Sequence, residues 1–394
     1  MVCMCLELLG MKLLIIFSCC LTFYRSSACA TKIHPTIELA KSAGFPVEEH
    51  RTVTEDGYLI VLHRIPPLAS IREQRVVIYI HGLFASSLDM VIRGRKMGFG
   101  YQLSEAGFDV WLPNLRGSTD NPITVNVTKN NPWDFSWDEN ARYDFPAIMD
   151  YVLATTGTRK VSTIGMSMAA NVVLGGVALR PQYNQRLGCM VFFAPTARMK
   201  YTTSFVRFAA PHWQWFQKIA EIYRIYKIPN MNNELFHRLM SWLCSLRNVG
   251  LFFCTSIIFS AESNIFQIEK ELVPTLFKYY PHPGSTKTVI HYFQMANSGR
   301  FCAFDYGPEQ NVVKYNQTVP MGYDLSKVTA PAAIFYSKWD SMVNYQDAEW
   351  LASQLNTILA YSVPKPNFAH LSFQYDPNLK NLVHNRVVNL LLSL

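Results

Sequence analysis

Short apolar runs alternate with amphipathic stretches along most of this chain, and the alternation predicts strands separated by helices. Val76–Ile80 is continuously apolar, which is typical of a strand buried on both faces. Two further runs flank Asp56-Gly57, a pair that favours a hairpin turn. We expect strands at 51–54, 59–65, 76–80, 110–112, 161–164, 190–193, 332–336 and 359–363, and helices at 98–106, 139–154, 346–354 and 379–392. This pattern predicts an α/β fold with a mostly parallel eight-stranded sheet and antiparallel strands at one edge.

One long segment interrupts the alternation. From 198 to 328 the apolar pattern is helical, irregular and rich in aromatic residues and methionine. A segment of this length inside an α/β domain predicts an inserted cap over the active site, because the strand pattern resumes at Ala332 and needs the earlier strands to complete the sheet. A second independent domain is the alternative. The predicted organisation is a core at 31–197 and 329–394 with a cap at 198–328.

The N-terminus has the pattern of a signal peptide at residues 1–30. Lys12 precedes an apolar stretch, and Ala28-Cys29-Ala30 matches a cleavage site. A membrane anchor is the rival interpretation, but the apolar run falls short of the roughly 20 residues that span a bilayer. The later apolar segment Leu251–Ser260 is also short and predicts a buried helix or strand.

Composition indicates a globular protein, with 49% hydrophobic and 16% charged residues among 394. The net charge of +8 could favour anionic lipid surfaces, but the basic residues are scattered, which fits a solubility charge better and argues against nucleic-acid binding.

Cysteines and sequons agree with an oxidising compartment. Five of nine cysteines lie within the first 30 residues. The remaining Cys189, Cys244, Cys254 and Cys302 have no zinc-site spacing and allow three full pairings, among which sequence cannot choose. Asn126 and Asn316 begin glycosylation sequons.

The stretch from Val161 to Ala170 carries the first candidate for chemistry. A predicted strand runs into Gly165, and a helix follows Ser167, which is the small-x-Ser-x-small pattern of a nucleophile elbow. Small residues at Gly165 and Ala169 are needed because the strained turn brings the strand and the helix close together. A helix-capping serine is the ordinary alternative.

A serine nucleophile needs a histidine base and an acid that orients it, in the chain order Ser, Asp, His for this fold. Asp340 follows the predicted strand 332–336, and His370 follows 359–363. Both therefore lie after the carboxyl ends of strands, where active sites of α/β folds gather. Each could be an ordinary loop residue, and Asp347 is the second candidate for the acid.

An oxyanion hole requires two backbone N–H groups. One is expected from Met168, directly after the nucleophile, and the other from Leu83 in the loop after the strand 76–80. Gly82 would let this backbone approach closely, whereas His81 is expected to be structural.

At this point the chain resembles the acid lipase family of α/β-hydrolases, which includes gastric and lysosomal acid lipases and insect relatives. The resemblance covers nearly the whole mature chain and rests on 45–50, 56–58, 64–66, 81–83, 109–112, 114–117, 135–139, 143–147, 304–307 and 370–373. It implies hydrolysis of triacylglycerols or cholesteryl esters at a micelle or membrane surface, by a secreted or lysosomal enzyme. It further implies a helical cap with a movable lid, no metal or organic cofactor and no obligate protein partner. The family's cap disulfide maps onto Cys244 and Cys254, which leaves Cys189 and Cys302 free or differently paired.

The elbow departs from the family's usual Gly-His-Ser-Gln-Gly, because Met166, Met168 and Ala169 replace His, Gln and the last Gly. The backbone donor at position 168 survives this change, so we expect an active hydrolase with an altered rate or substrate choice. The altered elbow is the one feature that favours the alternative, a non-catalytic lipid-binding or carrier protein. The cap aromatics Trp213, Trp215 and Phe216 fit either an acyl-chain site or the packing core of the cap.

Overall fold

Eight strands form one mixed sheet with the order β1-β2-β4-β3-β5-β6-β9-β10. The pairs β1–β2 and β2–β4 are antiparallel, and all other neighbours are parallel. The predicted fold, with its antiparallel hairpin at one edge, is therefore confirmed. The strands are β1 (Glu48–Val53), β2 (Leu59–Ile65), β3 (Arg75–Ile80), β4 (Phe108–Asn114), β5 (Val161–Met166), β6 (Leu187–Phe193), β9 (Ala332–Tyr336) and β10 (Thr357–Ser362).

The computed structural model describes residues 34–68, 75–118, 123–125, 130–229, 234–246, 249–262 and 267–394. The predicted signal peptide and the sequon at Asn126 lie outside these ranges. Within them, no single helix is long and apolar enough to cross a membrane.

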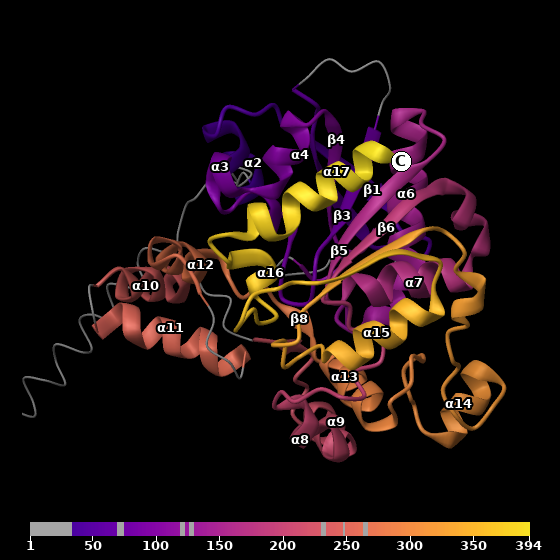
Figure 1. The fold of residues 1–394 in the computed structure, drawn as a ribbon. Helices are drawn as coiled ribbons and strands as arrows, with labels where there is room; N and C mark the ends of the chain where they lie inside the picture. Colours follow the sequence, from indigo (N-terminus) through magenta and orange to yellow (C-terminus); the bar gives the residue numbers. More distant parts are fainter. Residues whose placement is uncertain are drawn as a thin grey trace, which may run out of the picture. The chain divides into compact units, whose positions relative to one another are not determined.

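Helices cover both faces of the sheet (Figure 1). Alternate residues of β3 enter two different cores: Ile78 packs with α6, α7 and α15, whereas Val77 packs with α2, α4 and α17. The helices of this α/β part are α2 (Pro35–Ser42), α3 (Gly94–Met97), α4 (Phe99–Glu105), α5 (Trp137–Glu139), α6 (Phe145–Thr156), α7 (Ala169–Leu179), α15 (Tyr345–Gln354), α16 (Ser372–Tyr375) and α17 (Asn385–Ser393).

Local signals explain where the longest of these helical segments starts and stops. Ser136 and Glu139 form a reciprocal capping box at the start of α5, and a π-helical turn joins α5 to α6. Gly157 ends α6 in a left-handed conformation that lets its N–H bond the Leu153 carbonyl. The helix predicted at 139–154 is confirmed, with two further residues at each end.

The strand predicted at 110–112 is longer than expected. β4 begins at Phe108 and includes Asp109, which is buried and paired with Arg64 of the adjacent β2. The charge interrupts the apolar pattern in the sequence, but the ion pair across the two strands satisfies it in the fold.

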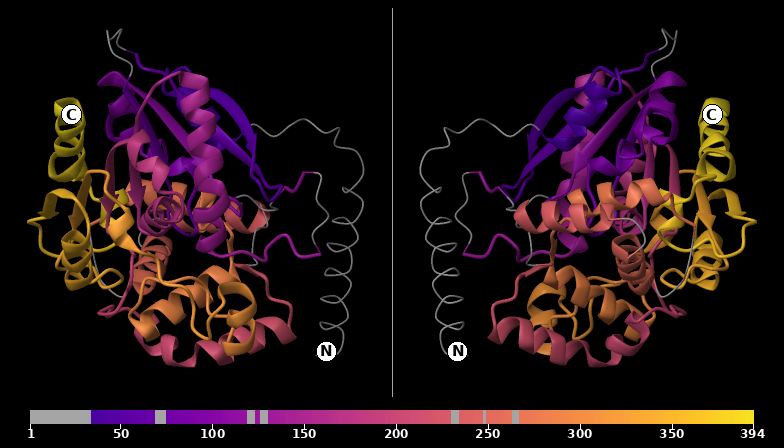
Figure 2. Two further views of the ribbon diagram at one scale, coloured as in Figure 1. Left: turned by 90° about the vertical axis from the view of Figure 1, so that its right-hand side faces the viewer. Right: turned by 90° about the vertical axis from the view of Figure 1, so that its left-hand side faces the viewer.

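The segment between β6 and β9 is helical, with one two-stranded ribbon, and among its described residues it adds nothing to the main sheet (Figure 2). It holds α8 (Val206–Ala209), α9 (Trp213–Ile222), α10 (Glu234–Ser245), α11 (Val249–Glu262), α12 (Val273–Tyr279), α13 (Thr286–Ser298), α14 (Pro308–Tyr315), β7 (Lys227–Ile228) and β8 (Gly284–Ser285). The exact limits of the cap, 198–328, stay a prediction.

The apolar segment Leu251–Ser260 forms a helix, which is one of the two structures expected for it. The prediction that this segment is buried is wrong. In α11, Phe252 is 74% and Phe253 is 50% exposed. Cys254, on the opposite side, is buried and forms a disulfide with Cys244 of α10. The apolar pattern alone could not distinguish this helix from a core helix, because it extends around nearly the whole surface of α11.

Candidate active site

Ser167 occupies a sharp turn between β5 and α7. Its φ of 56° is in the left-handed region, which is a strained conformation for a side chain other than glycine. The turn is held by the Ser167 N–H, which donates to the Phe193 carbonyl at 2.9 Å, and by its carbonyl, which accepts from Ala170 N–H at 3.1 Å. This is the strand–turn–helix context that a nucleophile elbow requires.

Gly165 and Ala169 pack directly against each other across this turn. A Cβ atom at Gly165 would lie 2.6 Å from Ala169 Cβ, which is closer than two such atoms approach in proteins. The small residues expected at both positions are therefore explained by the approach of β5 to α7.

Gly165→Ala should shift one of these two elements, because the new methyl group meets Ala169. We expect the free energy of unfolding to fall by about 1–3 kcal/mol, measured by urea denaturation. Adding Ala169→Gly removes the clashing methyl and should restore part of the loss. If Gly165→Ala alone left the protein as stable as the original, the packing described here would be contradicted.

His370 and Asp340 lie together after the carboxyl ends of β10 and β9. His370 Nδ1 is 2.9 Å from Asp340 Oδ2, and Asp340 Oδ1 accepts the N–H groups of Met342 and Val343, both at 2.8 Å. Only 6% of His370 and 4% of Asp340 is exposed. Because the carboxylate accepts, Nδ1 carries the proton, and Nε2 is the basic nitrogen of the neutral ring.

Asp347, the second candidate for the acid, is engaged elsewhere. Its Oδ1 pairs with Arg198 Nε at 2.8 Å, and its Oδ2 accepts the Tyr201 N–H at 2.8 Å. This carboxylate therefore ties α15 to the start of the predicted cap.

The loop after β3 packs against the elbow. A Cβ at Gly82 would be 3.5 Å from Ser167 Cβ and 3.3 Å from the Met166 carbonyl. A side chain at position 82 would therefore crowd the Met166 carbonyl, which accounts for a small residue where this loop approaches the serine. His81 is structural, as expected: its Nε2 accepts the Leu115 N–H, Nδ1 donates to the Gly82 carbonyl, and burial lowers its pKa to about 4.

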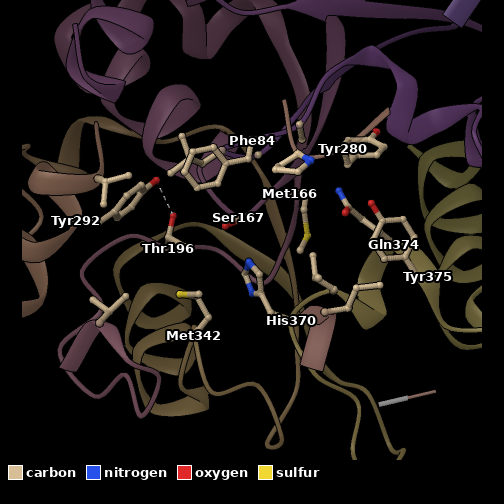
Figure 3. A pocket seen from close by; sticks show the side chains of 18 of the residues that line it. Phe84, Met166, Ser167, Thr196, Tyr280, Tyr292, Met342, His370, Gln374 and Tyr375 are labelled. Carbon is tan, nitrogen blue, oxygen red and sulfur yellow. Dashed lines mark hydrogen bonds between the residues drawn. The ribbon is translucent and has the colours of Figure 1, made fainter. Parts of the chain in front are cut away.

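A cavity of about 500 Å³ opens at the elbow (Figure 3). Ser167, His370, Gly82 and Leu83 contribute to its wall, which is otherwise mainly apolar. None of the aromatics proposed for an acyl-chain site lines it: Trp213 and Phe216 pack into the core, and Trp215 is exposed. The cavity is instead lined by Phe84, Met199, Phe205, Val206, Ile257, Ile258, Leu276, Phe277, Val289 and Phe293, among others.

The two methionines of the elbow have different positions. Met166 lines the cavity beside Ser167 (Figure 3), whereas Met168 is buried in the core beneath α7. The side chain at 168 therefore points away from the space in which an ester would bind, while its N–H lies at the N-terminal end of α7.

Polar residues that the sequence did not single out flank the serine. Thr196 and Tyr292 share the amide oxygen of Asn171, at 2.5 and 3.3 Å, on one side of Ser167. Gln374 lies on the other side (Figure 3). No motif marks these positions, because they come from segments that only the fold brings together.

Asp89 is a buried carboxyl group that lies behind the cavity wall on the Gln374 side. It accepts hydrogen bonds from the hydroxyls of Tyr79 and Tyr280 and from the Gln374 amide. Burial raises its pKa from 3.8 to about 6, although these hydrogen bonds favour the charged form.

The pKa of Asp89 predicts how stability changes with pH. Because the folded state binds this proton more tightly than the unfolded state, its contribution is complete below about pH 4 and is lost as pH rises through 6. Relative to Asp89→Asn, which does not titrate, the wild type should lose up to about 3 kcal/mol of unfolding free energy between pH 4 and 7. Urea denaturation of both proteins across this range measures the difference between their unfolding free energies. A difference that does not change with pH would contradict the prediction.

The remaining cysteines and the second sequon are also placed. Cys189 and Cys302 are buried free thiols, and burial raises their pKa values to about 12 and about 11. Asn316 is exposed at the end of α14. Across the described ranges, no group of three or more His, Cys, Asp or Glu side chains could hold a metal ion.

Comparisons with known proteins agree with this geometry. A family model described as alpha/beta hydrolase fold matches residues 75–373, and one described as a partial alpha/beta-hydrolase lipase region matches residues 36–94. A solved structure of a soluble variant of monoglyceride lipase from Saccharomyces cerevisiae has a TM-score of 0.51 at 14% identity, covering 88% of this chain and 95% of that chain, which supports the fold alone.

Two relatives are similar over almost their full length. Gastric triacylglycerol lipase of Bos taurus is 30% identical over 360 residues, covering 88% of each chain. Lipase 3 of Drosophila melanogaster is 32% identical over 359 residues, covering 89% of this chain and 91% of that protein. The chain therefore belongs to the acid lipase family of α/β-hydrolases, whose members are carboxylic ester hydrolases.

Proposed function

We propose that the protein is a secreted or lysosomal lipase that hydrolyses esters of neutral lipids, with Ser167 as nucleophile, His370 as general base and Asp340 as the acid that orients the histidine. One observation carries the proposal. Ser167, in its strained turn, and His370, hydrogen-bonded to Asp340, both line one mainly apolar cavity. A capping serine or a loop histidine needs none of this arrangement.

In the proposed reaction, Ser167 Oγ attacks the ester carbonyl carbon while His370 Nε2 takes its proton. The N–H groups of Leu83 and Met168 stabilise the oxyanion of the tetrahedral intermediate. The bond to the alcohol oxygen then breaks as His370 returns the proton to that oxygen, which leaves an acyl-enzyme. Water, activated by the same histidine, releases the acid and restores the serine.

The lining of the cavity supports esters with apolar acyl chains, since burying each CH₂ group is worth about 0.8 kcal/mol. We propose triacylglycerols or cholesteryl esters as the neutral lipids, in line with the triacylglycerol lipase among the relatives. The test is to assay the purified protein against emulsified triacylglycerol, cholesteryl ester and soluble short-chain esters across a range of pH. A protein that hydrolyses none of them contradicts the proposal. The alternative of a non-catalytic carrier is supported by the altered elbow alone.

Exposed apolar side chains next to the cavity support action at a micelle or membrane surface. In α11, Ile257 and Ile258 line the cavity, while Phe252 and Phe253 point to solvent. A lipid surface would cover the exposed part of this helix and bring substrate to the cavity.

Replacing Phe252 and Phe253 together with serine should lower hydrolysis of emulsified triacylglycerol about tenfold or more, because about 150 Å² or more of apolar surface per aromatic ring is lost from the lipid contact. Hydrolysis of a soluble butyrate ester should stay near its original rate. Val313→Ser is the matched control, since Val313 is 86% exposed on α14 and does not line the cavity. Equal losses on emulsion and soluble ester would contradict a role at the surface.

Three features support passage through the secretory pathway. The N-terminal pattern predicts a signal peptide, Cys244 and Cys254 form a disulfide, and Asn316 offers an exposed sequon. We propose that Asn316 is glycosylated, and likewise Asn126, which lies outside the described residues. We infer no need for a cofactor, a nucleic acid or an obligate protein partner.

A further inference from the structure

Gln374 lies one helical turn after His370 and lines the same cavity. The Gln374 N–H donates to the Leu371 carbonyl, and the Phe373 N–H donates to the His370 carbonyl, so residues 370–374 form a turn. Side chains four residues apart on such a turn are neighbours. Gln374 therefore stands beside the proposed base, on the side of Ser167 opposite Thr196 (Figure 3).

Asp89 fixes which way the Gln374 amide points. Gln374 Nε2 is 2.8 Å from Asp89 Oδ2, which also accepts the Tyr79 hydroxyl at 2.9 Å. An ionised carboxylate only accepts hydrogen bonds, so the NH₂ group of the amide must face it. Asp89 lies behind the cavity wall and does not line it. Asp89 therefore binds the NH₂ end of the amide and leaves the carbonyl oxygen, Oε1, at the other end.

This oxygen needs a donor. Within the described residues, no N–H or O–H group donates to Gln374 Oε1. The surrounding wall is mainly apolar, and the Tyr280 hydroxyl on this side of the cavity donates to Asp89 instead. The Tyr375 hydroxyl lies near the amide in Figure 3, but no hydrogen bond joins it to Gln374. An acceptor held in a set orientation in an apolar cavity favours a ligand that brings its own donor, because an unpaired polar group there is unfavourable.

The reaction places the alcohol part of the ester next to this acceptor. His370 returns its proton to the alcohol oxygen, so the alcohol must lie beside the histidine. Triacylglycerols and cholesteryl esters have no hydroxyl group to donate. An ester of a polyol that keeps a free hydroxyl does.

We propose that Gln374 selects acylglycerols with a free hydroxyl, that is, mono- and diacylglycerols, by accepting a hydrogen bond from that hydroxyl through Oε1. Asp89 is a positioning residue that holds the amide in the accepting orientation. The inference rests on the proposed lipase function and adds a preferred class, the partial glycerides with a free hydroxyl, to the triacylglycerols and cholesteryl esters proposed above.

The test compares two soluble octanoate esters that differ only in the hydroxyls of the alcohol, monooctanoylglycerol and propyl octanoate. Binding is measured in the Ser167→Ala background by titration calorimetry, and kcat/KM is measured with Ser167 intact. Gln374→Met, which keeps the length and loses the acceptor, should weaken binding of monooctanoylglycerol and lower its kcat/KM about tenfold. Both quantities should change less than twofold for propyl octanoate.

Two further variants separate this role from a structural one. Asp89→Asn should reduce the preference for monooctanoylglycerol over propyl octanoate, because an asparagine can donate as well as accept and no longer fixes the amide. Tyr292→Phe removes a hydroxyl from the opposite side of the cavity and should leave the preference unchanged.

The outcomes distinguish the inference from the function on which it rests. If Gln374→Met leaves the binding preference intact, or Tyr292→Phe lowers it equally, the role of Gln374 is overturned even if the protein is an active esterase. If the intact protein hydrolyses neither ester, the proposed function fails. The binding data then still decide whether Gln374 accepts a hydrogen bond from the hydroxyl.

Discussion

Ser167→Ala is expected to lower kcat for a soluble ester by about ten-thousandfold or more. Without the hydroxyl there is no nucleophile for His370 to activate, and only the oxyanion donors and substrate binding continue to act. Hydrolysis of a p-nitrophenyl ester measures the loss. Labelling by a fluorophosphonate, which reacts with activated serines, should disappear in the same variant.

Ser162 provides the matched control, because it lies on the same strand, β5, without lining the cavity. Ser162→Ala should keep both labelling and turnover. A Ser167→Ala protein that is still labelled and still hydrolyses the ester would identify another residue as the nucleophile.

Asp340→Asn is expected to reduce kcat by about ten-thousandfold while the protein stays folded. Asparagine can turn its NH₂ group toward the histidine, and His370 Nδ1 would then have to accept, which moves the ring proton to Nε2. The nitrogen that should take the serine proton would already be occupied. Steady-state kinetics and circular dichroism of the variant measure activity and folding separately.

Asp347→Asn tests the second candidate for the acid. This change weakens the ion pair with Arg198, so the melting temperature should fall, whereas kcat should stay within a few-fold of the original. A larger loss of kcat in Asp347→Asn than in Asp340→Asn would reverse the assignment.

The sequence was sufficient for the parts of the fold that follow local patterns. The run Val76–Ile80 and the Asp56-Gly57 turn predicted the strand and hairpin found in β3, β1 and β2, because period and turn chemistry are local properties. The positions of Ser167, Asp340 and His370 followed from their places after predicted strands.

Other features depend on contacts between distant segments, and such contacts cannot be predicted from the local patterns of a single sequence. The exposed phenylalanines of α11 have the same local pattern as a buried helix, and only the packing of the fold separates the two. Likewise Asp89 is an ordinary residue in the sequence, and its burial arises because β3, the predicted cap and the turn after His370 meet around it.

The pairing of β6 with β9 has a consequence for synthesis of the protein on the ribosome. These adjacent strands are separated by the whole segment between Phe193 and Ala332, so β6 has an unpaired edge until nearly all of the chain has emerged. During that interval the nascent chain presents a row of unsatisfied N–H and C=O groups that can pair with other chains. A translation arrest before Ala332 would therefore produce an aggregation-prone fragment rather than a smaller enzyme, and chaperones would have to protect it until the last strands are made.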